Sequence, residues 1–142
     1  MVKILVIGSG AREHAIIKSL NKSKKEKEIY CLASNNNPGI SDICKEVKII
    51  DINNAQLIKD YSIKRNINIA IIGPEDPLAH GVADSLWEAE IGVVGPKKNL
   101  AQIETSKSFT RNLLREYKIP GCPKFKTFTN MEGVENFLFL LG

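Results

Sequence analysis

The stretch KILVIGSGAREHAIIKSL, residues 3–20, decides the fold of this chain. A short run of β-branched residues and leucine reaches two glycines separated by one serine, and residues in helical spacing follow at once. This pattern predicts a buried strand over Lys3–Gly8 and a helix over Ala11–Leu20. Gly8 and Gly10 allow the backbone to turn sharply and bring its N–H groups close to a ligand.

The same alternation of strand and helix continues to about residue 95. Apolar strands separated by helices form parallel sheets that are covered on both faces, so the pattern predicts an α/β fold with a doubly wound, Rossmann-like sheet. We expect the strand order 3-2-1-4-5, in which the carboxyl ends of strands 1 and 4 border a ligand crevice. The other strands are predicted at Glu28–Ala33, Val47–Asp51, Asn68–Gly73 and Gly92–Gly95, and the other helices from Asn53 or Asn54 to Arg65 and over Ala79–Glu90.

A change of character after Gly95 and Pro96 predicts a domain boundary near residues 96–100. We therefore assign residues 1–97 to one domain and residues 98–142 to the beginning of a second. The second is predicted to contain a long helical stretch over Leu100–Lys118, a strand over Lys124–Thr129 and a helix over Met131–Leu141 capped by Asn130.

The composition is typical of a globular protein, and the N-terminal residues predict a cytoplasmic location. Of the 142 residues, 43% are hydrophobic and 25% are charged, and no segment is apolar enough for a membrane-spanning helix. Only four apolar residues follow Lys3 before the glycines, so we expect no signal peptide. Cys31, Cys44 and Cys122 form no CxxC pair and are expected to be free thiols.

Charge and histidine spacing exclude two further classes of site. Much of the net charge of +4 comes from residues 18–27, KSLNKSKKEK, which we interpret as a solvated helix end. This segment has no arginine and no aromatic residue, so we expect no nucleic-acid partner. His14 and His80 have no metal-ligand spacing with the cysteines, so we expect no structural zinc.

The first glycine loop, GSGARE, is a candidate anion site. It precedes a helix, whose N-terminus attracts a phosphate, and Ser9 and Arg12 could add donors. The position of a third glycine is taken by Glu13, however. A carboxylate there is awkward beside a dinucleotide pyrophosphate and suits a polar substrate better. A simple tight turn remains the alternative.

Two further loops follow predicted strands. The loop NNNPG, residues 35–39, has turn-forming residues and is preceded by no acidic residue at the end of strand 2, which argues against NAD binding. In the loop GPEDPL, residues 73–78, two prolines fix an acidic segment. Glu75 and Asp76 could accept hydrogen bonds from sugar hydroxyls or an amine, or they simply favour the start of a helix.

Taken together, four segments resemble the phosphoribosylamine–glycine ligases (glycinamide ribonucleotide synthetases) of the ATP-grasp superfamily. They are GSGAREHA, NNPG, IIGPEDPL and GPKK followed by ETSKSF, and the resemblance extends to about Thr129. The chain departs from the family at Ala11, where glycine is usual. The resemblance implies a Rossmann-like domain before the start of an ATP-grasp domain. It also implies that 5-phosphoribosylamine and glycine are joined with ATP and Mg²⁺ or Mn²⁺, through a glycyl phosphate.

The resemblance also assigns site residues. Lys107 would contact ATP phosphates, and no catalytic residue or metal ligand falls in this chain. The family's lid, adenine-binding strands and Mg²⁺ carboxylates would lie beyond Gly142, so we expect no tightly bound cofactor and no activity from the chain alone. The missing domains would be its partners. The residues expected to bind the phosphoribosyl substrate are Gly8, Ser9, Gly10, Arg12, Glu13, Asn37, Gly39, Gly73, Pro74, Glu75 and Pro77.

Other readings differ in protein class. One is a nicotinamide-dependent reductase, which the missing third glycine and the missing acidic residue after strand 2 argue against. Another is a non-catalytic module that binds ribose phosphates. A third is a carboxylase of the same superfamily, over which GPEDPL and SKSF favour the ligase.

Overall fold

The computed structural model describes residues 1–141 and divides the chain into two compact units. The first unit covers Met1–Ala101, and the second begins at Gln102. No helix within the described residues is long and apolar enough to cross a membrane.

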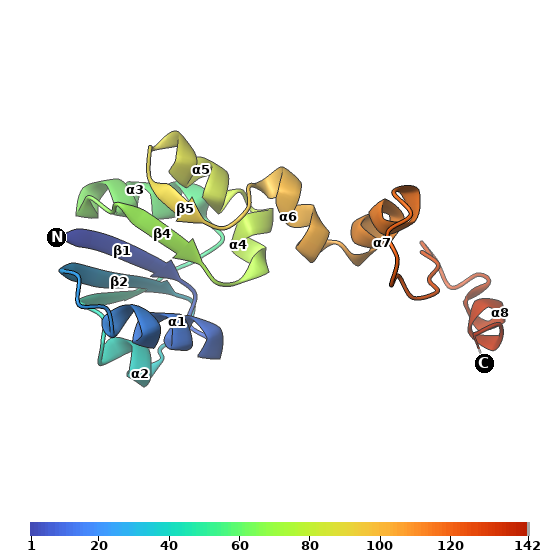
Figure 1. Ribbon diagram of the computed structural model, residues 1–142, viewed down its shortest axis with the longest axis horizontal. Helices are drawn as coiled ribbons and strands as arrows, with labels where there is room; N and C mark the ends of the chain where they lie inside the picture. The colour runs from blue at the N-terminus through green and yellow to red at the C-terminus, as the bar shows by residue number, and fades with distance from the viewer. Residues whose placement is uncertain (142) are drawn as a thin grey trace. The chain divides into compact units, whose positions relative to one another are not determined.

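The first unit contains a sheet of five parallel strands with helices between them (Figure 1). The strand order is 3-2-1-4-5, which confirms the predicted topology. The strands are β1 (Val2–Ile7), β2 (Lys27–Ala33), β3 (Glu46–Ile49), β4 (Ile69–Ile72) and β5 (Gly92–Val94). The helices are α1 (Ala11–Asn21), α2 (Pro38–Ser41), α3 (Ala55–Arg65), α4 (Glu75–Ala79) and α5 (Val82–Glu88).

The central strand β1 is buried on both faces. Val6 pairs with Cys31 of β2 on one side and with Ile71 of β4 on the other. Successive side chains of a strand point to opposite faces, so Leu5 belongs to the core beneath α3, α4 and α5, whereas Val6 belongs to the core beneath α1 and α2. This explains why the strand is apolar throughout, and it places the β1 loop at the middle of the sheet edge.

Two helices differ from the sequence prediction. The helix expected over Ala79–Glu90 is shorter and begins after Gly81, which has a left-handed φ of 78° and separates α5 from the short helix α4 that precedes it. The segment expected to be only a turn after β2 forms the short helix α2. Of the two candidate caps for α3, Asn54 is the one used, and its Oδ1 accepts a hydrogen bond from Leu57 N–H at 3.0 Å.

The second unit is less regular than predicted. The long helix expected over Leu100–Lys118 is two helices, α6 (Lys98–Thr105), which begins in the first unit, and α7 (Lys107–Glu116), because Ser106 adopts an extended conformation and caps α7. Residues 124–129 do not form the predicted strand. A strand requires a neighbouring strand as hydrogen-bonding partner, and all five strands among the described residues belong to the first unit. The last helix, α8 (Val134–Phe139), is shorter than the predicted Met131–Leu141.

Candidate ligand site at the carboxyl edge of the sheet

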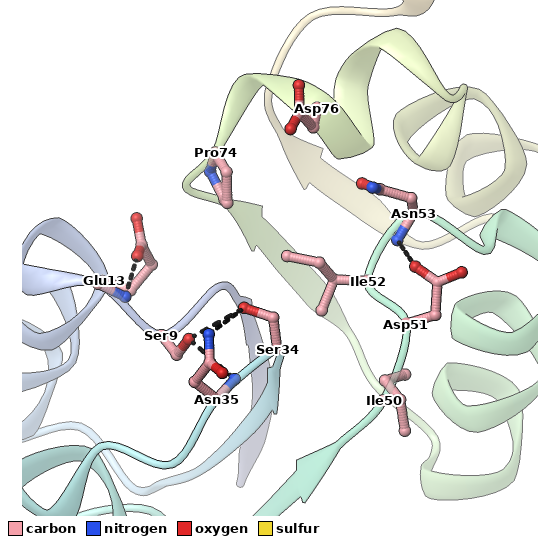
Figure 2. Close-up of a pocket in the computed structure, with 11 residues that line it drawn as sticks. Ser9, Glu13, Ser34, Asn35, Ile50, Asp51, Ile52, Asn53, Pro74 and Asp76 are labelled. Carbon is pink, nitrogen blue, oxygen red and sulfur yellow. Dashed lines mark hydrogen bonds between the residues drawn. The ribbon is translucent and has the colours of Figure 1, made fainter.

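A cavity of about 520 Å³ opens at the carboxyl edge of the sheet (Figure 2). It lies where the loops after β1, β2, β3 and β4 meet, which is the crevice that the topology predicts. The first two loops contribute Ser9, Gly10, Glu13, Ser34 and Asn35, and the other two contribute residues 50–53, Pro74 and Asp76.

Glu13 is the buried centre of this region. Its side chain is only 4% exposed, and Oε2 accepts a hydrogen bond from Gly10 N–H at 2.6 Å. A Cβ at Gly8 would lie 2.8 Å from Glu13 Cγ, and a Cβ at Gly73 would overlap Oε1. Glycine is therefore required on both sides of the carboxylate, since a larger residue would push it away.

This packing shows why the loop does not suit a dinucleotide. In the dinucleotide fingerprint the third glycine allows the helix to pack closely on the strand, and the pyrophosphate lies at the helix N-terminus. Here the Glu13 carboxylate fills that space and already accepts the Gly10 N–H. A second anion at the same place would meet a like charge, which counts against the reductase reading.

Arg12 connects the loops after β1 and β4 without lining the cavity. Its Nη2 lies 3.4 Å from Glu75 Oε2, and its Nε lies 4.0 Å from Glu13 Oε1. The Oε1 atom of Glu13 has no hydrogen-bond partner among the described residues. The pKa of the Glu75 carboxyl is lowered below 4.5, mainly by a hydrogen bond from the backbone N–H of Glu75 itself and secondly by the Arg12 guanidinium.

Ser9 connects the first loop to the loop after β2. Its hydroxyl lies 3.3 Å from the Ser34 hydroxyl and accepts a hydrogen bond from Asn35 N–H at 3.3 Å. Its carbonyl oxygen accepts a hydrogen bond from Asn37 Nδ2 at 3.0 Å. Asn37 therefore positions the first loop from behind, although it does not itself line the cavity.

Besides Gly8, Arg12, Asn37, Gly73 and Glu75, three more of the expected site residues do not line the cavity. Gly39 packs against the ring of His14, and a Cβ there would come within 2.7 Å of Nε2. Pro77 lies within α4, and its side chain is fully buried. Lys107 belongs to the second unit, where it is the first residue of α7 and not part of a helix interior.

Lys107 borders a separate cavity of about 320 Å³ within the second unit. Arg111 and Lys126 also line it, so three cationic side chains surround this cavity. The Lys126 ammonium lies 4.9 Å from the centre of the Phe128 ring. A cavity of this charge suits an anionic ligand.

The sequence motifs did not single out the loop after β3, although it forms one wall of the first cavity. Asp51 Oδ1 accepts a hydrogen bond from Asn53 N–H at 3.0 Å, which fixes the loop. The predicted strand order was the available signal, because it places the carboxyl end of strand 3 at the same edge as strands 1 and 4.

The fold and the cavity define a doubly wound α/β domain with a candidate ligand site at the carboxyl edge of its sheet. The chain belongs to the phosphoribosylglycinamide synthetase family: the family model "Phosphoribosylglycinamide synthetase, N domain" matches residues 2–104.

Curated relatives agree with this family. The chain is 45% identical over 141 residues to a phosphoribosylamine–glycine ligase of Methanosarcina barkeri, which covers 99% of this chain and 33% of the relative. It is 47% identical over 138 residues to the protein of the same name from Methanococcus vannielii, covering 96% of this chain and 31% of the relative. The chain thus spans about a third of the length of the curated relatives it matches.

Solved structures share the fold at low sequence identity. A phosphoribosylglycinamide synthetase from Anaerococcus prevotii matches with a TM-score of 0.63 and 15% identity, over 98% of this chain and 34% of the other. An N5-carboxyaminoimidazole synthetase from Staphylococcus aureus, complexed with ADP, matches with a TM-score of 0.72 and 12% identity, over 99% of this chain and 36% of the other. The α/β fold is therefore the one found in these synthetases.

Proposed function

We propose that this chain is the substrate-binding N-terminal part of a phosphoribosylamine–glycine ligase, which joins 5-phosphoribosylamine to glycine with ATP and yields glycinamide ribonucleotide, ADP and phosphate in purine biosynthesis. The observation that carries the proposal is the meeting of two sequence motifs at one cavity. Ser9, Gly10 and Glu13 of GSGAREHA and Pro74 of GPEDPL line it together, and these motifs belong to the part of the chain that the family model covers.

The expected substrate residues divide into three roles in this proposal. Ser9, Gly10 and Pro74 face the phosphoribosyl substrate directly. Glu13 fixes the surrounding loops, with Gly8 and Gly73 allowing it to approach. Arg12, Glu75 and Asn37 hold the loops in place, whereas Gly39 and Pro77 are residues of α2 and α4 and help to pack these two helices.

The proposal also assigns the cationic cavity of the second unit. Lys107, with Arg111 and Lys126 beside it, would hold phosphates of ATP at the start of the second domain, which we place at residues 98–142. A lysine ammonium is a suitable point charge for a phosphate chain. When bound with Mg²⁺ or Mn²⁺, ATP would supply the phosphoryl group that activates glycine. We expect the ligase to act in the cytoplasm on these small molecules, without a nucleic-acid or membrane partner.

A titration of the ¹⁵N-labelled chain with ribose 5-phosphate tests the substrate assignment, because two-dimensional NMR detects weak binding and locates it. Saturable shifts are expected for amides of residues 8–13, 34–37 and 73–76. NADH serves as the matched control and should leave these amides unshifted. Saturable NADH shifts at this site, or none with ribose 5-phosphate at millimolar concentration, would contradict the proposal.

An assay with phosphoribosylamine, glycine and ATP tests the second part. We expect no product from the 142-residue chain alone, because curated relatives that bear the ligase name are about three times as long. Joined to the remaining domains of such a relative, the chain should support product formation. Sustained turnover by the chain alone would contradict this expectation, and an inactive chimera that binds ATP normally would count against the ligase itself.

A further inference from the structure

The polar groups around the first cavity are strongly unbalanced in charge. Glu13, Asp51 and Asp76 contribute carboxylates, and among the described residues that line the cavity there is no Lys, Arg or His. Arg12, the cation of the first loop, pairs with Glu75 instead. A phosphate in this cavity would therefore meet like charges, whereas hydroxyl or amine groups would meet acceptors.

The N-terminus of α1 is already partly occupied by a carboxylate of the protein itself. Gly10 N–H already donates to Glu13 Oε2, so a carboxylate of the protein lies where an external anion would otherwise bind. This carboxylate is buried among Gly8, Gly10 and Gly73 and cannot simply swing into solvent. The cavity is thus left to the uncharged or cationic part of a ligand.

Asn53 is a lining residue whose side-chain oxygen is not engaged within the protein. Its Oδ1 is buried and has no hydrogen-bond partner among the described residues. Figure 2 shows its amide pointing from the β3 loop toward the space beside Asp76 and Pro74. Its backbone is held on both sides, by the hydrogen bond to Asp51 and by the cap that Asn54 forms on α3. The Nδ2 group has no hydrogen bond among the described residues and is not buried, so it can donate to a hydroxyl group in the cavity, and a turn of the amide would bring Oδ1 to the same place as an acceptor.

We propose that this cavity holds the hydroxyl-bearing ring of a phosphosugar, with the phosphate outside it, and that the Asn53 amide hydrogen-bonds one ring hydroxyl. The inference rests on the proposed function, because it takes the phosphoribosyl group as the ligand. It replaces the expectation that the first glycine loop holds the phosphate. It also makes Asn53 a specificity-determining residue on a loop that none of the sequence motifs includes.

The test compares four probes by NMR titration: ribose 5-phosphate, its 2-deoxy and 3-deoxy analogues, and inorganic phosphate. At least one deoxy analogue should bind the unaltered chain about three- to tenfold more weakly than ribose 5-phosphate, as expected for one lost hydrogen bond. Asn53→Ala should reduce this ratio to about one. Inorganic phosphate alone should not shift the amides of residues 9–13 or 51–53.

Asn54→Ala is the matched control, because it alters the neighbouring asparagine and weakens only the helix cap. It should lower the melting temperature and leave the hydroxyl preference unchanged. If Asn53→Ala retains the preference, or if inorganic phosphate shifts the same amides with an affinity similar to that of ribose 5-phosphate, the inference is wrong while the proposed function stands. If ribose 5-phosphate does not bind at all, both are wrong.

Discussion

The Glu13 carboxylate packs directly against the backbone of Gly73, so closely that a Cβ at position 73 would overlap Oε1. Glu13 lies in the first turn of α1, and Gly73 follows β4, so this contact joins the two loops at the centre of the sheet edge. The ligand site therefore depends on a buried contact as much as on the side chains that face the cavity.

Gly73→Ala should destabilise the first unit and weaken ligand binding together. The added methyl group must displace the Glu13 carboxylate, and overpacking of this kind costs about 1–3 kcal/mol. Urea unfolding measures the stability, and titration with ribose 5-phosphate measures binding. Gly92→Ala is the matched control, since a Cβ there would make ordinary contacts at 3.5 and 3.6 Å. A Gly73→Ala chain as stable as the control would contradict the packing described.

Glu13→Ala should lower the free energy of unfolding by about 1–2 kcal/mol, because it removes the acceptor for Gly10 N–H at the start of α1. Glu13→Gln should cost less, since an amide oxygen can still accept that hydrogen bond. Chemical unfolding of both variants tests the order. Glu26→Gln, at a side chain that is 80% exposed, is expected to have little effect. Equal losses for Ala and Gln would show that the hydrogen bond is not the cause.

The hydrogen bond that the Glu75 carboxylate accepts from its own backbone N–H, together with its ion pair with Arg12, should make part of the stability sensitive to acid. Because the pKa of Glu75 is lower in the folded chain than its usual 4.5, its contribution is present above that value and is lost as the pH falls through the folded-state pKa. The difference in unfolding free energy between the unaltered chain and Glu75→Gln should therefore be largest near neutral pH and shrink below about pH 4. A difference that stays constant with pH would contradict this prediction.

The three thiols should react at very different rates. Burial raises the pKa of Cys31 to about 12 and that of Cys44 to about 11, so neither forms much thiolate at pH 8. Cys122 is half-buried and, unlike Cys31 and Cys44, packs in neither core cluster of the first unit, so it should react first with a thiol-specific dye. In the folded chain one thiol per molecule should react rapidly with the dye, and unfolding in urea should make the other two thiols reactive. Cys122→Ser removes the fast phase if this assignment is correct, and a fast phase that persists would contradict it.

Lys107→Ala should weaken binding of a fluorescent ADP analogue by roughly tenfold, since it removes a cation from the second cavity. Lys126→Ala should act in the same direction. Lys124→Ala provides a control at an exposed lysine outside the lining residues. If all three variants bind the analogue as the unaltered chain does, the assignment of this cavity to ATP phosphates is wrong.

The fold of the first unit could be predicted from the sequence because its strands are apolar throughout. Apolar runs such as Ile4–Ile7 that alternate with helical segments are typical of a parallel sheet covered on both faces, and the glycines mark the places where each strand gives way to a loop. The sequence does not reveal that helices are interrupted at Gly81 and Ser106. Helical spacing continues across both residues, and the break depends on backbone conformations that spacing does not reveal.

The candidate site could be predicted only in part. The glycines and Glu13 stand out as a motif, but their packing against one another depends on how β1 and β4 lie side by side. Asn53 carries no sequence signal, because an asparagine before a helix is typical of a cap. Its distinct position became evident when Asn54 was seen to form the cap and Asn53 to face the cavity.

The buried acid at position 13 also restricts how this domain can change over evolutionary time. Conversion to a dinucleotide carrier would require glycine at that position, yet the first substitution would leave a hole between three existing glycines and an unsatisfied amide. The intermediate sequence would be less stable before it gained any new ligand. Proteins that have acquired a glutamate at this position should therefore evolve dinucleotide binding less readily, because the packing around the glutamate makes the first step destabilising.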